Sequence, residues 1–184
     1  MKKFCITFLS ICILLLCGVG VYLNSAPAKT EYLRIHIRAN SNMESDQRVK
    51  LLVKDVVVNY LTPYIAEINT TQEAYQVIES KLREIEKIAD HTLKENGFKY
   101  TSHAKLTEEK FPTRTYENLT LETGYYDALI LELGNAQGDN WWCVVYPPLC
   151  FTGEGVNYKY KSKIMEIIKR FYERKDKEDK CEKY

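Results

Sequence analysis

An uncharged run at residues 4–23 divides this chain into a leader and a body. Two lysines precede the run, and the small-residue pattern Ala26-Pro27-Ala28 follows it. This arrangement is typical of an export signal, and the run is long enough to cross a bilayer as a helix. The lysines favour a cytoplasmic N-terminus. We therefore expect residues 1–28 to be a cleaved signal peptide or an uncleaved anchor, with the body outside the cytoplasm.

The body has the size of one globular domain. A chain of 184 residues with 45% hydrophobic residues can bury one core but is short for two. We expect a single domain at residues 29–172 and a charged, disordered tail at residues 173–184. The whole chain carries 26 basic and 25 acidic side chains, so no strong field favours nucleic acid as a partner.

The body begins with a predicted strand. Between Tyr32 and Ala39, apolar residues alternate with Arg34, His36 and Arg38, which is the period of a strand with one buried and one wet face. We interpret His36 as a hydrogen-bonded structural histidine rather than a catalytic base.

Two helices and then several strands are predicted to follow. The first helix begins at Ser45 or Asp46 and closes or kinks at Pro63, with an apolar stripe at Val49, Leu52, Val53, Val56 and Tyr60. The second runs from Thr70 or Thr71 to Asn96-Gly97. Four further strands are predicted at residues 98–105, 110–116, 125–133 and 141–146, and a short terminal helix after residue 158.

These elements predict an α+β fold, in which two helices pack on one face of a largely antiparallel sheet, after the N-terminal signal or anchor helix. The order of the strands stays open.

The sequence lacks the patterns of a catalytic centre. It contains no HExxH, CxxC, GxSxG or glycine-rich phosphate loop, and its three histidines are not spaced as metal ligands. We therefore expect no catalytic residue, metal or cofactor, and no enzymatic activity. Cys143 and Cys150 are predicted to form a structural disulfide, because an oxidising exterior permits pairing and redox pairs are usually closer in sequence. Cys181 is expected to be free.

The segment around these cysteines also has the composition of a recognition surface. Trp141 and Trp142 are neighbours on a strand, so they point to opposite faces and need different partners. Either another part of the chain covers each tryptophan, or one of them is exposed to bind a partner. Pro147-Pro148 would make the loop between the cysteines stiff.

Two segments resemble the stage II sporulation protein R family. In the first, the matching residues are His36, Ala39, Asn40, Ser41, Asp46, Gln47, Lys50 and Leu51. In the second, they are Asn140, Trp141, Trp142, Cys143, Pro147, Pro148, Leu149, Cys150 and Phe151.

This resemblance implies an exported signalling protein of endospore formation. Such a protein is exported into the space between the forespore and mother-cell membranes, soluble or anchored by residues 4–23. There it activates a membrane-embedded aspartic protease of the mother cell, which processes pro-sigma E. The residues expected to bind this partner or to support its surface are Asn40, Ser41, Asp46, Gln47, Asn140, Trp141, Trp142, Pro147 and Pro148. For the polar members, a turn or helix-cap role is an equal alternative.

Two other classes of function stay open. An extracytoplasmic enzyme, either a hydrolase or a thiol exchanger, would need its cysteines for function in a folded state. A cell-surface scaffold or wall-binding module would associate with envelope fragments and would leave proteolysis in a neighbouring compartment unchanged.

Overall fold

The computed structural model describes residues 31–116, 119–152 and 158–181. The main sheet contains four strands in the order β2-β5-β1-β6: β2 Ser102–Phe111, β5 Gly124–Leu133, β1 Leu33–Arg38 and β6 Asn140–Tyr146. The outer pairs β2–β5 and β1–β6 are antiparallel, while the central pair β1–β5 is parallel. The sheet is therefore largely antiparallel, as predicted, around a parallel centre.

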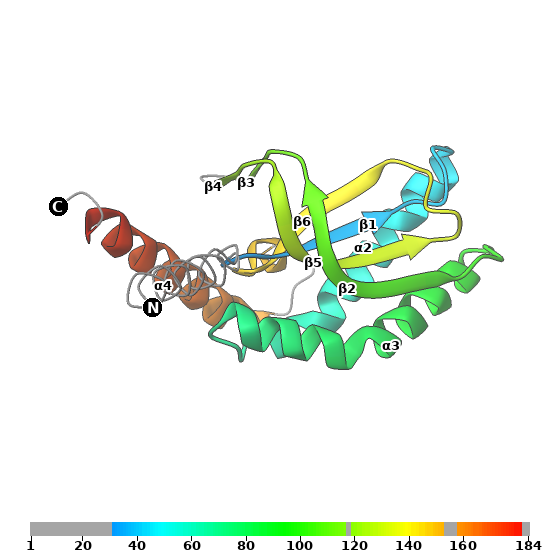
Figure 1. Cartoon of the computed structure of the whole chain (residues 1–184). Coiled ribbons are helices and arrows are strands. Elements are labelled where there is room, and N and C mark those ends of the chain that lie inside the picture. The colour runs from blue at the N-terminus through cyan, green and yellow to red at the C-terminus, as the bar shows by residue number, and fades with distance from the viewer. Residues whose placement is uncertain (1–30, 117–118, 153–157, 182–184) are drawn as a thin grey trace, which may run out of the picture.

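Two long helices cover one face of this sheet (Figure 1). They are α2, Glu44–Ile65, and α3, Thr71–Glu95. Both lie between β1 and β2 in the chain, so the connection through them carries the chain from a central strand to an edge strand. The predicted α+β arrangement, with two helices on one face of the sheet, is confirmed.

Helix α3 follows its sequence pattern closely. The Thr70 hydroxyl accepts a hydrogen bond from the Glu73 amide at 3.1 Å, and Gly97 takes a φ of +83° after the last turn. Its inner face buries Ala74, Ile78, Ile85, Ala89 and Leu93.

Helix α2 departs from its pattern. It begins at Glu44, so Asp46 lies in the first turn and points into the protein instead of capping the helix. Pro63 falls inside the last turn. Leu52, predicted on the buried stripe, is 45% exposed, whereas Val49 and Val53 are buried.

The strands after α3 differ from the prediction in bounds and number. Residues 98–101 are not in a strand, and β2 extends to Phe111. The predicted strand at 110–116 is divided: its start completes β2, and its end is β3, Arg114–Tyr116. A further short strand, β4, Leu119–Leu121, pairs with β3 in a separate two-stranded sheet.

The face of β1 that carries Arg34 and His36 was predicted to be exposed to solvent, but it is buried. Arg34 is 0% exposed and His36 is 1% exposed. Phe111 at the end of β2, Tyr116 of β3 and Trp142 of β6 cover these side chains. Only Arg38, at the end of the strand, stays partly exposed.

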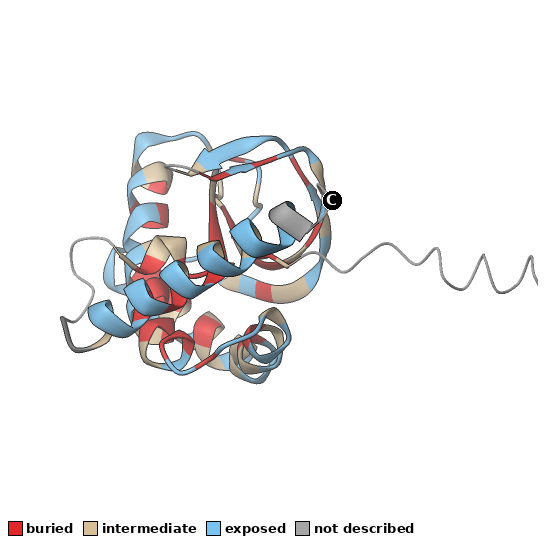
Figure 2. Ribbon diagram, turned by 90° about the vertical axis from the view of Figure 1, so that its left-hand side faces the viewer, coloured by how far each residue is buried: buried red, intermediate tan, exposed pale blue. Residues whose placement is uncertain are grey.

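Helix α4, Tyr158–Cys181, packs across one end of the domain (Figure 2). Ile164, Ile167 and Phe171 are buried, and the Phe171 ring lies 5.5 Å from that of Tyr32. Residues 173–181, predicted as part of a disordered tail, continue this helix. Lys175 helps to hold this part of the helix against the domain, because its ammonium group lies 5.0 Å from the Tyr32 ring centre.

None of the helices in the described ranges is long and apolar enough to span a bilayer. The predicted signal or anchor at residues 1–28 lies outside the described residues.

Candidate functional site

The predicted polar residues that follow β1 converge on one buried carboxylate. Asp46 is 1% exposed and accepts hydrogen bonds from Asn40 Nδ2 at 2.8 Å, Ser41 Oγ at 2.5 Å and Tyr100 Oη at 2.7 Å. Burial alone would raise the pKa of Asp46, but the hydrogen bonds from Ser41, Asn40 and Tyr100 outweigh burial and lower the pKa below its usual range. Asp46 therefore stays charged and fixes the chain after β1 against α2.

The same chain segment is tied to the loop before β6. Gln47 Nε2 donates to the Ser41 carbonyl at 2.9 Å, and Lys50 Nζ donates to Gln47 Oε1 at 2.6 Å and to the Asp139 carbonyl at 2.9 Å. Burial lowers the pKa of Lys50, although the charge of Asp139 acts in the opposite direction.

Backbone hydrogen bonds complete this connection. The Gly138 amide donates to the Ala39 carbonyl at 2.8 Å, and the Asn135 amide donates to Asn40 Oδ1 at 2.9 Å. We call residues 39–42 and 134–139, together with Asp46, Gln47, Lys50 and Tyr100, the loop junction. In it, Asn40, Ser41, Asp46 and Gln47 bond to one another and to the backbone, so their visible role is to support the surface.

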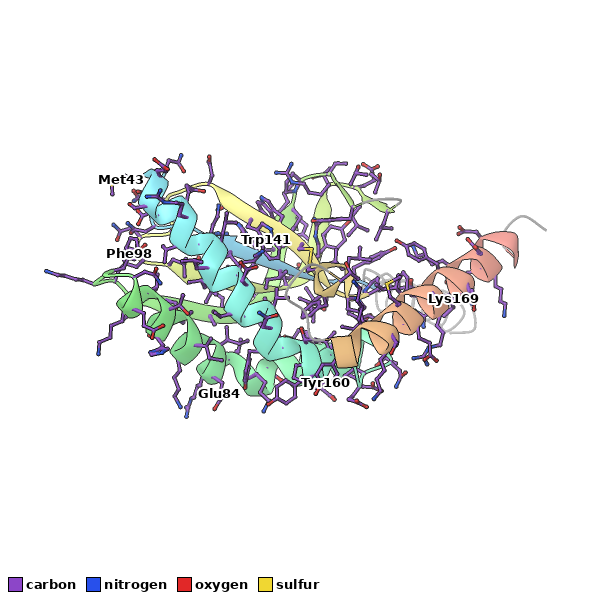
Figure 3. The ribbon with its side chains drawn as sticks, turned by 180° about the vertical axis from the view of Figure 1, so that it is seen from behind. Met43, Glu84, Phe98, Trp141, Tyr160 and Lys169 are labelled. Atoms are coloured by element: carbon purple, nitrogen blue, oxygen red, sulfur yellow. A yellow bond between two sulfur atoms is a disulfide. The ribbon has the colours of Figure 1, made fainter. Side chains whose placement is uncertain are left out.

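The two tryptophans lie on opposite faces of β6, as predicted. Trp141 is half-buried beside α2, where Lys54 Nζ lies 5.9 Å from its ring centre (Figure 3). Trp142 stacks on His36 with ring centres 3.7 Å apart and meets the Phe111 ring edge-on at 4.8 Å. Each tryptophan is thus packed against other parts of its own chain.

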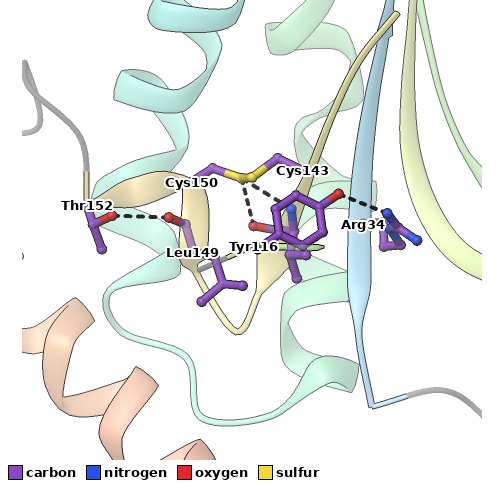
Figure 4. The surroundings of a disulfide bond; sticks show 7 residues. Arg34, Tyr116, Cys143, Leu149, Cys150 and Thr152 are labelled. Atoms are coloured by element: carbon purple, nitrogen blue, oxygen red, sulfur yellow. Dashed lines mark hydrogen bonds between the residues drawn. A yellow bond between two sulfur atoms is a disulfide. The ribbon is translucent and has the colours of Figure 1, made fainter. Parts of the chain in front are cut away.

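The predicted disulfide is present and joins Cys143, in the middle of β6, to Cys150 in the turn that follows the strand (Figure 4). Cys143 and Cys150 have Cα atoms 6.2 Å apart, and the Val144 amide donates to Cys150 Sγ at 3.2 Å. Between the cysteines, Pro147-Pro148 lead into a short 3-10 turn, Leu149–Phe151.

The predicted site residues therefore occupy two ends of β6 and do not form one patch. Asn140 is exposed where β6 leaves the loop junction, and Pro147-Pro148 lie at the other end of the strand.

A second cluster was missed by sequence reasoning. On the face of β1 opposite the helices, Arg34 lies among the rings of Phe111, Tyr116 and Tyr126, and His36 lies beside it along the strand. The strict alternation of basic residues along β1 was the available signal, but alternation alone cannot show that another element covers the second face.

His36 is buried and stacked on Trp142, but the hydrogen bonds expected for a structural histidine are not seen among the described residues. Neither ring nitrogen makes a hydrogen bond of good geometry in the described chain, although the Asn140 side chain lies close enough to favour the protonated form. Burial is the largest influence and lowers the pKa of His36 from 6.5 to about 4, with the charges of Arg38 and Arg34 acting in the same direction.

This pKa predicts a loss of stability in mild acid. The unfolded chain takes up a proton on His36 near pH 6.5, whereas the folded chain does so only near pH 4. The stabilisation is complete above pH 6.5 and is lost as the pH falls toward 4, by roughly 3 kcal/mol in total. Urea unfolding at pH 7.5, 5.5 and 4.5 measures this slope. His36→Gln should flatten it, and an unchanged slope in that variant would assign the effect to other groups.

The disulfide predicts a second measurable contribution. Replacing both Cys143 and Cys150 by alanine should lower the free energy of unfolding by about 2.5 kcal/mol, because the short ring no longer restricts the unfolded chain. Urea unfolding without reductant measures the loss, with Cys181→Ala as the control. If the double variant unfolds at the same urea concentration as the parent, the bridge is not a stabilising element.

Within the ranges that the structure describes, no three His, Cys, Asp or Glu side chains are placed to hold a metal ion. The geometry defines a disulfide-bridged α+β domain in which Asn40, Ser41, Asp46 and Gln47 support the backbone of two loops.

Comparisons with known proteins place this domain in a family. A family model described as stage II sporulation protein R matches residues 29–157. The chain is 36% identical over 163 residues to stage II sporulation protein R of Bacillus subtilis (strain 168), a match that covers 82% of this chain and 73% of that protein. No solved structure gives a significant match. The chain belongs to the stage II sporulation protein R family.

Proposed function

We propose that this chain is an exported signalling protein of endospore formation, which activates a membrane-embedded aspartic protease of the mother cell and thereby triggers processing of pro-sigma E. The observation that carries this proposal is the family match, because it spans residues 29–157 and includes the loop junction and the disulfide. The uncharged run at residues 4–23 supports export into the space between the forespore and mother-cell membranes.

In this proposal the chain acts by binding and not by catalysis. A rigid domain that binds the active arrangement of the protease more tightly than the inactive one shifts the population toward the active state. The loop junction and the disulfide support such a role, since the junction holds the loop before β6 and the disulfide ties β6 to the turn after it before any partner binds. Nucleic acid is not a partner in this proposal.

Reconstitution in a non-sporulating host tests the proposal. The full chain is coexpressed with the protease and pro-sigma E, and the processed fraction is measured by immunoblotting. We expect at least a tenfold increase over a host without the chain. A version without residues 1–28, produced in equal folded amount in the cytoplasm, serves as the control and should give no increase. Absence of processing with export confirmed would contradict the proposal.

The same system separates signalling from the two other classes of function. A signal should give processing that rises with the amount of exported chain and then saturates as the protease becomes fully bound. An enzyme should turn over a substrate without the protease, and a wall-binding scaffold should sediment with envelope fragments and leave processing unchanged.

A further inference from the structure

Arg34 is a buried cation without an acidic partner among the described residues. Its side chain is 0% exposed, and its one hydrogen bond there is from Nη2 to Tyr116 Oη at 2.8 Å. Nε and Nη1 are buried and have no hydrogen-bond partner in residues 31–116, 119–152 and 158–181. A guanidinium group removed from water is usually paired with a carboxylate, because its planar fork of donors matches two carboxylate oxygens.

Aromatic rings offset part of the cost of burying this charge. The Arg34 Cζ atom lies 4.1 Å from the ring centre of Phe111, 4.8 Å from that of Tyr126 and 5.8 Å from that of Tyr116. Such contacts offset only part of the cost, because the desolvation penalty of an unpaired buried ion exceeds the attraction of a few ring faces. The rings hold the guanidinium group in place, but Nε and Nη1 stay without an acceptor among the described residues.

Nearby acidic side chains on the same face of the sheet form ion pairs with another arginine. Arg38 pairs with Glu109 and, at 2.7 Å, with Glu132. Glu132 also accepts from Lys105 at 3.0 Å. Glu109 Oε2 also lies 3.8 Å from His36 Nδ1. Within the part of the chain that the structure describes, the charge of Arg34 is therefore unmatched, while these acids on its own face already have basic neighbours.

A pocket lies on the other side of Tyr116. Its volume is about 260 Å³, and its lining is mostly apolar, with contributions from Leu149, Met165, Ile168 and Tyr172. The Tyr116 ring forms part of its wall, while the Tyr116 hydroxyl points away from the pocket lining to Arg34 (Figure 4). One side chain of the β3–β4 sheet thus separates an apolar pocket from an unmatched buried cation.

We propose that this pocket receives an apolar segment of the receptor protein that carries a carboxylate, and that Arg34 pairs with the carboxylate when the Tyr116 hydroxyl releases it. The apolar lining takes the side chain beside the acid, and the charge of Arg34 selects an acidic group over a neutral one. This proposal rests on the proposed function, because it names the chemistry of the receptor segment.

A small aromatic acid tests the pocket without the receptor. Phenylacetate is added to the purified body, residues 29–184, and the ring signals of His36 are followed by nuclear magnetic resonance across a pH titration. The charge of Arg34 lowers the pKa of His36, so a carboxylate paired with Arg34 should raise this pKa above its value of about 4. The neutral analogue phenylacetamide should leave the titration unchanged. Equal effects of both compounds would overturn the proposal.

Matched variants assign the effect to individual residues. Arg34→Gln should weaken phenylacetate binding at least tenfold, and Tyr116→Phe should strengthen it several-fold, since the competing hydrogen bond is gone. Arg114→Gln removes an exposed arginine near Trp142 and should have no effect. If Arg34→Gln does not fold, the Tyr116→Phe result decides: unchanged or weaker binding overturns the proposal.

Acids of the chain itself are the competing occupants. Glu117 and Glu154 follow the pocket-lining residues Tyr116 and Thr152 closely in sequence and lie outside the described residues. If Glu117→Gln or Glu154→Gln alone lowers the pKa of His36 and strengthens phenylacetate binding, the site is filled internally, and the proposal of a receptor carboxylate is overturned.

The processing assay then connects the pocket with the receptor. Folded, exported Arg34→Gln should lower processing at least tenfold, and Arg114→Gln should not. Normal processing by Arg34→Gln would overturn the pocket proposal and leave the proposed function standing. Failure of the unsubstituted chain would count against the proposed function, while the phenylacetate result would still stand on its own.

Discussion

Replacing Asp46 by alanine is expected to lower the free energy of unfolding by about 3 kcal/mol. The substitution removes the acceptor that Asn40, Ser41 and Tyr100 share and leaves their donors without a partner in a buried site. The loss should exceed that of a single hydrogen bond, because charged acceptors form stronger bonds and unsatisfied donors carry the full desolvation cost.

Urea unfolding at pH 7.5 measures this effect. Asp55→Ala is the matched control, since Asp55 lies on the same helix, is mostly exposed and pairs with Lys54. It should change stability by less than about 0.5 kcal/mol. A loss below about 1 kcal/mol for Asp46→Ala would show that the loop junction does not depend on its carboxylate.

Gly138→Ala should destabilise the protein by a similar amount, about 3 kcal/mol. A Cβ atom at this position would overlap the Ser41 carbonyl group and lie 2.9 Å from the Cβ atom of Ala39. The loops cannot separate to make room without breaking the hydrogen bond from the Gly138 amide to the Ala39 carbonyl. The substitution therefore causes either a steric clash in the loop junction or the loss of this hydrogen bond.

Gly124→Ala provides the comparison for this substitution. A Cβ atom at Gly124 would meet its nearest neighbour, Tyr126, at 3.5 Å, which is ordinary contact. We expect its effect on urea unfolding to stay below about 1 kcal/mol. Equal losses for the two variants would show that the close approach of the loops at Gly138 is not what makes Gly138→Ala destabilising.

The secondary-structure elements predicted best from the sequence are those whose signals lie within the element or next to it. The capping threonine, the apolar period and the terminal glycine of α3 all lie within the helix or next to it, so the sequence alone locates the helix. The pairing of Cys143 with Cys150 was also predictable, because the two cysteines lie close together in a segment expected to face an oxidising exterior.

Predictions of function were likewise limited where they depended on contacts between segments distant in the sequence. The resemblance to the family was confirmed, but the sequence gave no sign that Asn40, Ser41 and Gln47 turn toward Asp46 and the backbone of the loops. A polar turn residue can face a partner or its own chain, and the choice depends on the loop that packs against it.

What the sequence by itself determined is the two long helices, the approximate places of the strands in the main sheet, the disulfide and the family. Only the tertiary structure decided the parallel pairing of β1 with β5, the junction of two distant loops and the burial of Arg34 and His36. The physical reason is that alternation along a strand defines two faces, while the exposure of each face depends on what covers it. For Arg34 that cover includes Tyr116, which lies 82 positions further along the chain.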